Sequence, residues 1–157
     1  MKIYLSGFIN GNKIEECLSW RRKIREYFDL KSKWHGKLTF LDPLNGKSFE
    51  AIDSDGFKSN IPAKAFLKRD HHCVRIAELV IVNLNTFGET RPPVGTICEL
   101  AWAWIYDIPV IVIAEDKHYT EHPFVKDIAD IIVSSVEELL EKEYLSYYYK
   151  GLVSADY

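Results

Sequence analysis

Glu99 is the side chain whose place in the sequence is best suited to chemistry. It falls within residues 94–100 (Val-Gly-Thr-Ile-Cys-Glu-Leu), at the beginning of a predicted helix that follows a predicted strand. The partial positive charge of a helix N-terminus stabilises a carboxylate, so we expect Glu99 to be ionised, with a lowered pKa. An ionised carboxylate can act as a nucleophile at a glycosidic carbon. Glutamates also occur in first helical turns simply to stabilise the helix, and position alone leaves that alternative open.

Asp70 is the second candidate. Phe66 lies four residues before it and Cys73 three residues after it, so the three share one face of a predicted helix. A carboxylate on an apolar, core-facing stripe is costly unless it is paired or used. An ion pair with Arg69 or Arg75 is the structural alternative. In partly apolar surroundings the pKa of Asp70 would be raised, and two carboxylates whose pKa values are pushed apart form an acid and nucleophile pair.

The elements that must position these two side chains alternate along the chain. Short apolar runs predict five strands, at residues 3–6, 38–41, 79–84, 109–114 and 131–133. Helical patterns cover residues 14–28, 63–77 and 94–106, and Ser135 with Glu138 predicts a capping box at the beginning of a last helix. Strands that alternate with helices predict an α/β fold with a parallel five-stranded sheet and helices on both faces, in a single domain over residues 1–157.

Other stretches carry no regular pattern. Residues 44–62 are polar and predict a long loop, and loops of that length are often functional. Residues 121–123 fall in a second predicted loop, and the tyrosine-rich tail at 147–157 has no clear period. The basic residues of the first helix are expected mostly on its solvent face; they are Arg21, Arg22, Lys23 and Arg25.

The carboxyl ends of the strands are where an open parallel sheet binds its ligands. Here those ends are Ser6-Gly7-Phe8, Asp42-Pro43, residues 83–93 and the segment from Ala114 onward. Gly7 and Gly95 are expected to permit close backbone approach at neighbouring strand ends. Tyr4 and Phe8 flank the first end and could stack on a flat ligand such as a base, although core packing is the commoner role of an isolated aromatic.

The composition narrows the class of protein. The chain has 157 residues, 47% hydrophobic and 27% charged, which excludes disorder as its main state. A net charge of −3 argues against nucleic acid as a partner. No apolar stretch approaches the roughly 18 residues of a membrane span, and the apolar run at the N-terminus is too short for a signal peptide. We therefore expect a reduced, soluble, cytoplasmic protein.

Metal and cofactor motifs are not recognisable. Three cysteines without a Cys-x-x-Cys pair indicate neither a disulfide framework nor a zinc site. His71 and His72 are adjacent on a predicted helix and point apart, so they are poor candidates to share an ion. The sequence lacks the Gly-x-Gly-x-x-Gly and Gly-x-x-x-x-Gly-Lys-Ser/Thr patterns. We expect no metal and no cofactor.

The predicted helix at residues 94–106 carries more apolar surface than one sheet face can cover. Its last turns contain Trp102, Trp104, Ile105 and Tyr106, which surround much of the circumference. Large uncovered apolar patches usually mark subunit contacts. This pattern predicts a homo-oligomer, at least a dimer, and packing within one chain is the alternative.

Several motifs resemble, in order, those of a known family. They are Tyr4-Leu5-Ser6-Gly7-Phe8, Asp42-Pro43, Arg69-Asp70, Asn83-Leu84 and Gly95-Thr96-x-x-Glu99-Leu100-Ala101-Trp102-Ala103. Together they resemble the nucleoside 2-deoxyribosyltransferases, whose superfamily also contains nucleoside 5′-monophosphate N-glycosidases. The resemblance runs from Met1 to about Ile113. It implies a Rossmann-like (flavodoxin-like) fold and transfer of 2-deoxyribose between nucleobases by a retaining double displacement, with deoxynucleosides and free nucleobases as substrates.

The resemblance also implies residue roles. Glu99 matches the nucleophile that holds the sugar covalently, Asp70 the carboxylate that protonates the departing base, and Tyr4 the tyrosine that positions the nucleophile. Substrate-binding residues are expected at Gly7, Phe8, Asp42, Asn45, Lys47, Asn83, Gly95, Thr96, His122 and Tyr157. The family often completes each site from a neighbouring subunit, here through residues 121–124 or the tail.

Departures from the family pattern leave the substrate open. Pro93 occupies the position where some members carry a second base-contacting aspartate, and Arg91 and Thr96 stand where phosphate-binding glycosidases tend to have serines. This favours nucleosides over nucleotides. The alternatives are a nucleoside or nucleotide N-glycosidase, in which water replaces the acceptor base, and a non-catalytic nucleotide-binding sensor on the same fold.

Overall fold

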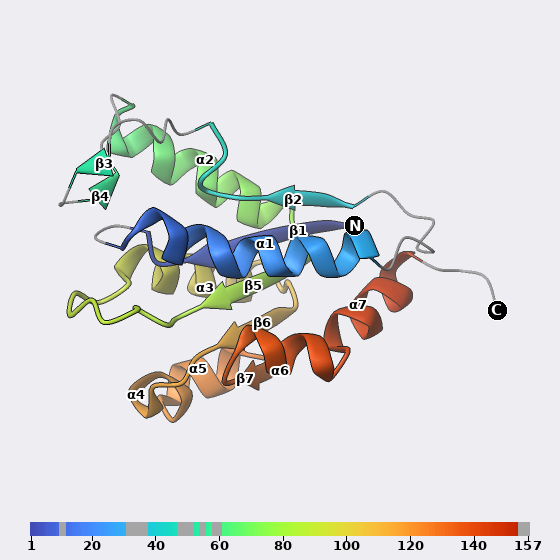
Figure 1. Ribbon diagram of the computed structural model, residues 1–157. Coiled ribbons are helices and arrows are strands. Elements are labelled where there is room, and N and C mark those ends of the chain that lie inside the picture. The colour runs from blue at the N-terminus through green and yellow to red at the C-terminus, as the bar shows by residue number, and fades with distance from the viewer. Residues whose placement is uncertain (10–11, 31–37, 47–51, 54–55, 58–60, 154–157) are drawn as a thin grey trace.

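A sheet of five parallel strands lies at the centre of the computed structural model, which describes residues 1–9, 12–30, 38–46, 52–53, 56–57 and 61–153 (Figure 1). The strand order is β2-β1-β5-β6-β7. The strands are β1 (Lys2–Gly7), β2 (Thr39–Leu41), β5 (Leu79–Asn83), β6 (Val110–Ile113) and β7 (Ile131–Val133). The predicted fold class is confirmed.

The helices are divided between the two faces of the sheet, as expected. One face is covered by α1 (Ile14–Leu30), α6 (Val136–Glu141) and α7 (Tyr144–Val153). The other is covered by α2 (Ala63–Arg75), α3 (Val94–Ile105), α4 (Lys117–Thr120) and α5 (Pro123–Ile128). Across the described part of the chain, no helix has both the length and the apolar character needed to span a membrane.

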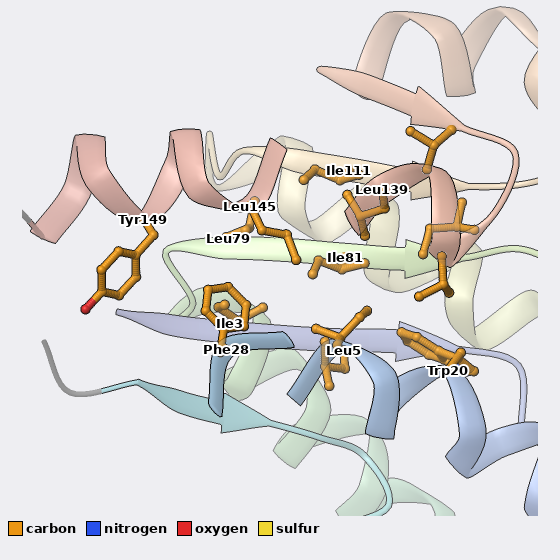
Figure 2. Packing of buried hydrophobic residues seen from close by; sticks show 14 of the residues in the cluster. Ile3, Leu5, Trp20, Phe28, Leu79, Ile81, Ile111, Leu139, Leu145 and Tyr149 are labelled. Carbon is orange, nitrogen blue, oxygen red and sulfur yellow. The ribbon is translucent and has the colours of Figure 1, made fainter. Parts of the chain in front are cut away.

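Alternation along β1 separates two apolar cores. Ile3 and Leu5 face α1, where Trp20 and Phe28 pack in the same cluster (Figure 2). Tyr4 points to the opposite face, among side chains of α2 and α3. The strands β5 and β6 are buried on both sides, which explains why they read as continuous apolar runs. Neighbouring residues of β1 therefore serve different faces, and this decides which of them reach the site.

Two segments expected to be irregular are helical. In the loop after β6, Asp116 caps α4 by accepting a hydrogen bond from His118 N, and Pro123 stands at the beginning of α5. Residues 147–153 of the tail belong to α7, in which Leu145 and Tyr149, four residues apart, are buried against the sheet (Figure 2). The exposed and half-buried tyrosines between these two obscure the helical period in the sequence.

The long polar segment after β2 is not a loop throughout. Within it, β3 (Ile52–Asp53) pairs with β4 (Gly56–Phe57) as a two-stranded antiparallel sheet. Strands of two residues are too short to give an alternating pattern, so the sequence offered no signal for them.

The cap of α6 forms as predicted, but only in part. Ser135 Oγ accepts a hydrogen bond from Glu138 N at 3.1 Å, which satisfies one N–H group of the first turn. The carboxylate of Glu138 reaches Ser134 instead of the cap residue, and accepts from its N–H and hydroxyl, each at 2.8 Å. The reciprocal half of the capping box is therefore shifted by one residue.

The expectation that Arg21 lies on the solvent face of α1 is wrong, because its side chain is buried. Its side chain is 1% exposed and donates hydrogen bonds to the carbonyl oxygens of Cys17 at 2.5 Å and Gly7 at 3.3 Å. Its Nε lies 3.3 Å from Asp42 Oδ1. Arginine tolerates such burial because its donors fan out in a fixed plane and can be met together by several acceptors. Arg21 thereby ties α1 to the carboxyl end of β1 and to the turn after β2.

Gly7 is required by the close packing of α1 on the end of β1. A Cβ atom at this position would lie 2.7 Å from Cζ2 of Trp20, closer than real contacts allow. The expected close approach is confirmed here, with a tryptophan ring as the neighbour. At Gly95 a Cβ atom would meet no heavy atom within 4 Å among the residues described. Among the described residues, therefore, no other segment makes the close approach to Gly95 that the sequence predicted.

We predict that Gly7→Ala lowers the free energy of unfolding by about 1–3 kcal/mol, because the added methyl group forces Trp20 or β1 to shift. Gly95→Ala is the matched control. There the methyl group enters open space in a helix, so the free energy of unfolding stays the same or rises by about 0.5–1 kcal/mol. Urea unfolding followed by tryptophan fluorescence measures both variants. Equal stability of the two would contradict this account of Gly7.

Candidate functional site

A pocket of about 450 Å³ opens at the carboxyl edge of the sheet. It is lined by Gly7, Phe8, Ile9, Pro43, Asp70, Arg91, Pro92, Val94, Gly95, Thr96 and Glu99. The strand order reverses at this point, because the chain leaves β1 for β2 on one side and then returns to β5 on the other. Open α/β sheets bind ligands at such a reversal, where the loops after the two central strands separate.

Glu99 contributes a buried carboxylate to this pocket. It is 8% exposed, and both of its oxygens are held: Oε1 accepts a hydrogen bond from Tyr4 Oη at 2.7 Å, and Oε2 accepts from Ser6 Oγ at 2.5 Å. Tyr4 and Ser6 are two residues apart on β1, so both point to the face that α3 covers. The two donors fix the orientation of the carboxylate toward the pocket.

Ser6 is the contact that the sequence reasoning missed. The expectation assigned the positioning of Glu99 to Tyr4, and the structure places Tyr4 in contact with it. The sequence did contain a signal for Ser6. Side chains alternate between the two faces of a strand, so the residue two positions after Tyr4 lies on the same face. A hydroxyl at that place can donate to the second carboxylate oxygen.

The expected lowered pKa of Glu99 is wrong. Burial raises the pKa of Glu99 to about 7, and the negative charge of Asp70 adds to the rise, while the hydrogen bonds from Ser6 and Tyr4 and the charge of Arg21 oppose it. The helix dipole has little effect, because Glu99 is the sixth residue of α3 and the field of a helix terminus fades within the first turn. Removal from water therefore outweighs the hydrogen bonds.

Tyr4 remains a hydrogen-bond donor across the whole physiological pH range. Burial, followed by the charge of Glu99, raises the pKa of its phenol far above the usual value. A phenolate facing a carboxylate in a buried site would be strongly disfavoured. The Tyr4 hydroxyl can therefore hold Glu99 but cannot supply a proton by ionising.

Asp70 reaches the same pocket from α2, and it is also paired. Arg69 Nε donates to Asp70 Oδ1 at 3.0 Å, and Arg69 Nη2 lies 3.0 Å from the same oxygen. The ion pair with Arg69, which the sequence left as the structural alternative, is present, and Asp70 also lines the pocket. A catalytic role for this carboxylate stays a prediction.

Four of the expected substrate-binding residues line the pocket, and four others lie elsewhere. Those in the lining are Gly7, Phe8, Gly95 and Thr96. The lining does not include Asp42, Asn45, Asn83 or His122. Lys47 and Tyr157 fall outside the described residues. Lining residues that were not proposed for the site are Ile9, Pro43, Arg91, Pro92 and Val94.

The four residues outside the lining have structural contacts or exposed positions. Asp42 holds Arg25 at 2.8 Å and accepts from Leu44 N at 2.9 Å. Asn83 Oδ1 accepts from the backbone N–H two residues later, at 3.0 Å. Asn45 is exposed in the turn after β2, and His122 is exposed before α5. Their expected roles at the substrate stay predictions.

Metal ions in proteins are bound by clusters of side chains. In the part of the chain that the structure describes, no group of three or more histidine, cysteine, aspartate or glutamate side chains is placed to hold a metal ion. Among the described residues, none of Cys17, Cys73 and Cys98 forms a disulfide. The polar side chains of the described lining are the carboxylates of Asp70 and Glu99, the hydroxyl of Thr96 and the guanidinium of Arg91.

Large apolar side chains remain exposed on α3 and α5. Trp104 is 62% exposed, Ile105 64% and Phe124 72%. These positions are where the sequence predicts a subunit contact. A homo-oligomer with shared sites stays a prediction.

We predict that Glu99→Gln makes the stability of the protein less dependent on pH. The folded-state pKa of Glu99, about 7, exceeds its ordinary value of 4.5, so folding favours the protonated form. That stabilisation is fully present below pH 4.5 and is lost as the pH rises through 7. Between these pH values, the free energy of unfolding of the wild type should fall by up to ~3 kcal/mol relative to that of Glu99→Gln. Urea unfolding of both proteins at pH 5, 6, 7 and 8 measures it, and a difference independent of pH would contradict it.

Comparisons with known proteins find a shared fold. No protein-family model and no curated protein sequence matches the chain. A conserved protein from Enterococcus faecalis has a TM-score of 0.62 at 16% identity, over 90% of this chain and 95% of its own. A CMP N-glycosidase of Clostridium botulinum has 0.57 at 14%, over 94% and 99%. A 2-deoxyribosyltransferase from Leishmania mexicana has 0.50 at 15%, over 90% and 98%. At these identities the likeness extends to the fold alone.

Proposed function

We propose that the protein breaks the N-glycosidic bond of a deoxynucleoside and transfers the 2-deoxyribose to another nucleobase through a covalent glycosyl-Glu99 intermediate. One observation carries the proposal. A buried carboxylate, held at both oxygens, shares a pocket at the sheet reversal with a second carboxylate, Asp70. Two carboxylates facing one sugar are what a retaining glycosyl transfer needs.

The first half of the reaction forms the intermediate. A Glu99 oxygen attacks C1′ of the sugar, the bond from C1′ to the base nitrogen breaks, and its electron pair stays on the base. The base takes a proton from Asp70 as it leaves. In the second half, a nitrogen of the acceptor base attacks C1′, Glu99 departs as a carboxylate, and the proton of the acceptor returns to Asp70. Two displacements at one carbon retain its configuration.

The protonation of Glu99 links this scheme to pH. With a pKa of about 7, Glu99 is only partly ionised in neutral solution, and it must be ionised to attack. The negative charge of Asp70 contributes to that raised pKa. The reaction balances when the proton that Glu99 loses passes to Asp70 and from there to the departing base.

The similar solved structures support a nucleoside or nucleotide as the substrate. One is a 2-deoxyribosyltransferase and another a CMP N-glycosidase, and both share the fold of this chain over nearly their whole length. Transfer and hydrolysis differ only in whether a base or a water molecule reaches the sugar held on Glu99.

A nucleoside 5′-monophosphate N-glycosidase is the second candidate. The sequence pattern favours nucleosides, but the place of Arg91 in the pocket lining supports a substrate that carries a phosphate. Arg91 lines the pocket and pairs with Glu89 at 2.7 Å. Gly95 and Thr96, in the first turn of α3, line the same pocket, and Pro93 before them gives that turn no side-chain cap. Helix N-termini and arginines both bind phosphate. A 5′-phosphate beside the sugar would meet the first turn of α3 and would compete with Glu89 for Arg91.

We predict that Glu99→Gln abolishes the covalent intermediate. Wild type incubated with a deoxynucleoside and no acceptor base should gain the mass of one deoxyribosyl group, and Glu99→Gln should not, because the amide keeps the shape but removes the nucleophile. Transfer should fall by about 10⁴-fold or more. Intact-protein mass spectrometry and product chromatography measure both. Glu115→Gln, at an exposed residue after β6, is the matched control. An adduct of undiminished amount in Glu99→Gln would reject the assignment.

We predict that product analysis with a panel of deoxynucleosides, their 5′-monophosphates and free bases shows a new nucleoside when an acceptor base is present. Release of free sugar at the same rate with and without acceptor would identify the glycosidase instead. If the 5′-monophosphate is the substrate, Arg91→Gln should raise KM about tenfold or more for it and leave KM for the nucleoside unchanged. If no compound of the panel gives a product, a non-catalytic nucleotide-binding sensor is the alternative that remains.

A further inference from the structure

We propose that Arg69 is a positioning residue, which fixes Asp70 at the pocket by anchoring it to the turn after β2. The inference rests on the function proposed above and adds a residue to which that function assigns no role. Arg69 does not appear among the residues that line the pocket. It acts through Asp70, the neighbour in sequence that does.

Arg69 joins three groups with one planar guanidinium. Nε donates to Asp70 Oδ1 at 3.0 Å, Nη1 donates to the carbonyl oxygen of Asn45 at 2.9 Å, and Nη2 donates to the carbonyl oxygen of Pro43 at 2.6 Å. Each nitrogen thus has an acceptor, and the acceptors come from two separate parts of the chain. Only arginine offers donors in a fixed fork of this kind.

The turn after β2, whose carbonyl oxygens bind Arg69, is itself stabilised by contacts of Asp42. Asp42 accepts from Leu44 N at 2.9 Å and its backbone carbonyl accepts from Asn45 N at 3.0 Å. Its carboxylate lies between two arginines of α1, with Arg25 Nη2 at 2.8 Å and Arg21 Nε at 3.3 Å. The Asp42 side chain is 4% exposed and that of Arg21 is 1% exposed, so this ion pair is buried. Arg69 therefore binds a turn that is tied to α1 by buried contacts.

This arrangement matters for the proton that the departing base needs. An aspartate on a helix surface can adopt several rotamers, and proton transfer requires a heavy-atom separation of about 2.6–3.2 Å. Arg69 holds Oδ1 in one place through two of its nitrogens. It also stabilises the carboxylate that Asp70 becomes once the base has taken its proton. No covalent step is added to the mechanism.

A purely structural role for Arg69 predicts something different. A strut between α2 and the turn would affect folding, and any loss of activity would be the same for every substrate. A positioning residue affects only the step in which Asp70 gives up a proton. The two roles separate on a substrate whose leaving group departs without a proton, such as a nitrophenyl 2-deoxyriboside.

The test uses the full chain with Arg69→Gln, Asp70→Asn and the double variant. Arg75→Gln is the matched control, because Arg75 lies on the same helix, is exposed, and contacts His72 at 3.2 Å. We expect Arg69→Gln to reduce kcat on a deoxynucleoside by about 10–100-fold, within the contribution of general acid catalysis, and by less than about threefold on the nitrophenyl substrate. In the double variant, kcat on the deoxynucleoside should stay within about threefold of Asp70→Asn alone.

The outcomes are separable. Equal losses on both substrates, or losses that multiply in the double variant, would overturn the inference while leaving the proposed function in place. A wild-type chain that is inactive on every substrate would overturn the proposed function and this inference with it. Thermal unfolding checks that each variant folds. If Arg69→Gln does not, Arg69→Lys keeps the charge without the fork, and the same contrast between the two substrates decides.

Discussion

The hydrogen bonds from Tyr4 and Ser6 to Glu99 are the interaction on which the candidate site depends. A carboxylate 8% exposed at the end of a sheet needs donors at both oxygens, and these come from one strand at alternate positions. The same alternation turns Leu5 and Gly7 toward α1, where the Trp20 ring lies against Gly7. The end of β1 thus faces the site on one side and the core on the other.

Three carboxylates near this edge of the sheet differ in their partners, and the difference matches the chemistry proposed for each. Asp42 lies between two arginines. Asp70 has one arginine beside it and lines the pocket. Glu99 is held by two neutral hydroxyls, which stabilise its charge less than a guanidinium would. Burial raises the pKa of Glu99 to about 7.

The sequence predicted the five strands of the parallel sheet, and it singled out Glu99 and Asp70, which both line the pocket, because strands and helix faces depend on local pattern. Apolar runs marked the five strands, and the strand ends marked Gly7 and Glu99. What it did not predict depends on contacts between distant segments. Arg21 is buried because carbonyl oxygens of β1 and the carboxylate after β2 meet it there, although its own helix gave no sign of this. Likewise, the pKa of Glu99 follows from burial by the whole fold, which outweighs its place on one helix.

The two prolines before α3 have a consequence for the entropy of binding. Pro92 lines the pocket, and Pro93, with φ of −78°, precedes the first residue of the helix. The carbonyl oxygens of both accept hydrogen bonds from the first turns of α3, at 2.8 and 3.0 Å. Each pyrrolidine ring removes one backbone rotation even from the unfolded chain. This wall of the pocket is therefore ordered when the protein folds, and a ligand that settles against it has less conformational freedom to freeze than it would at a flexible loop.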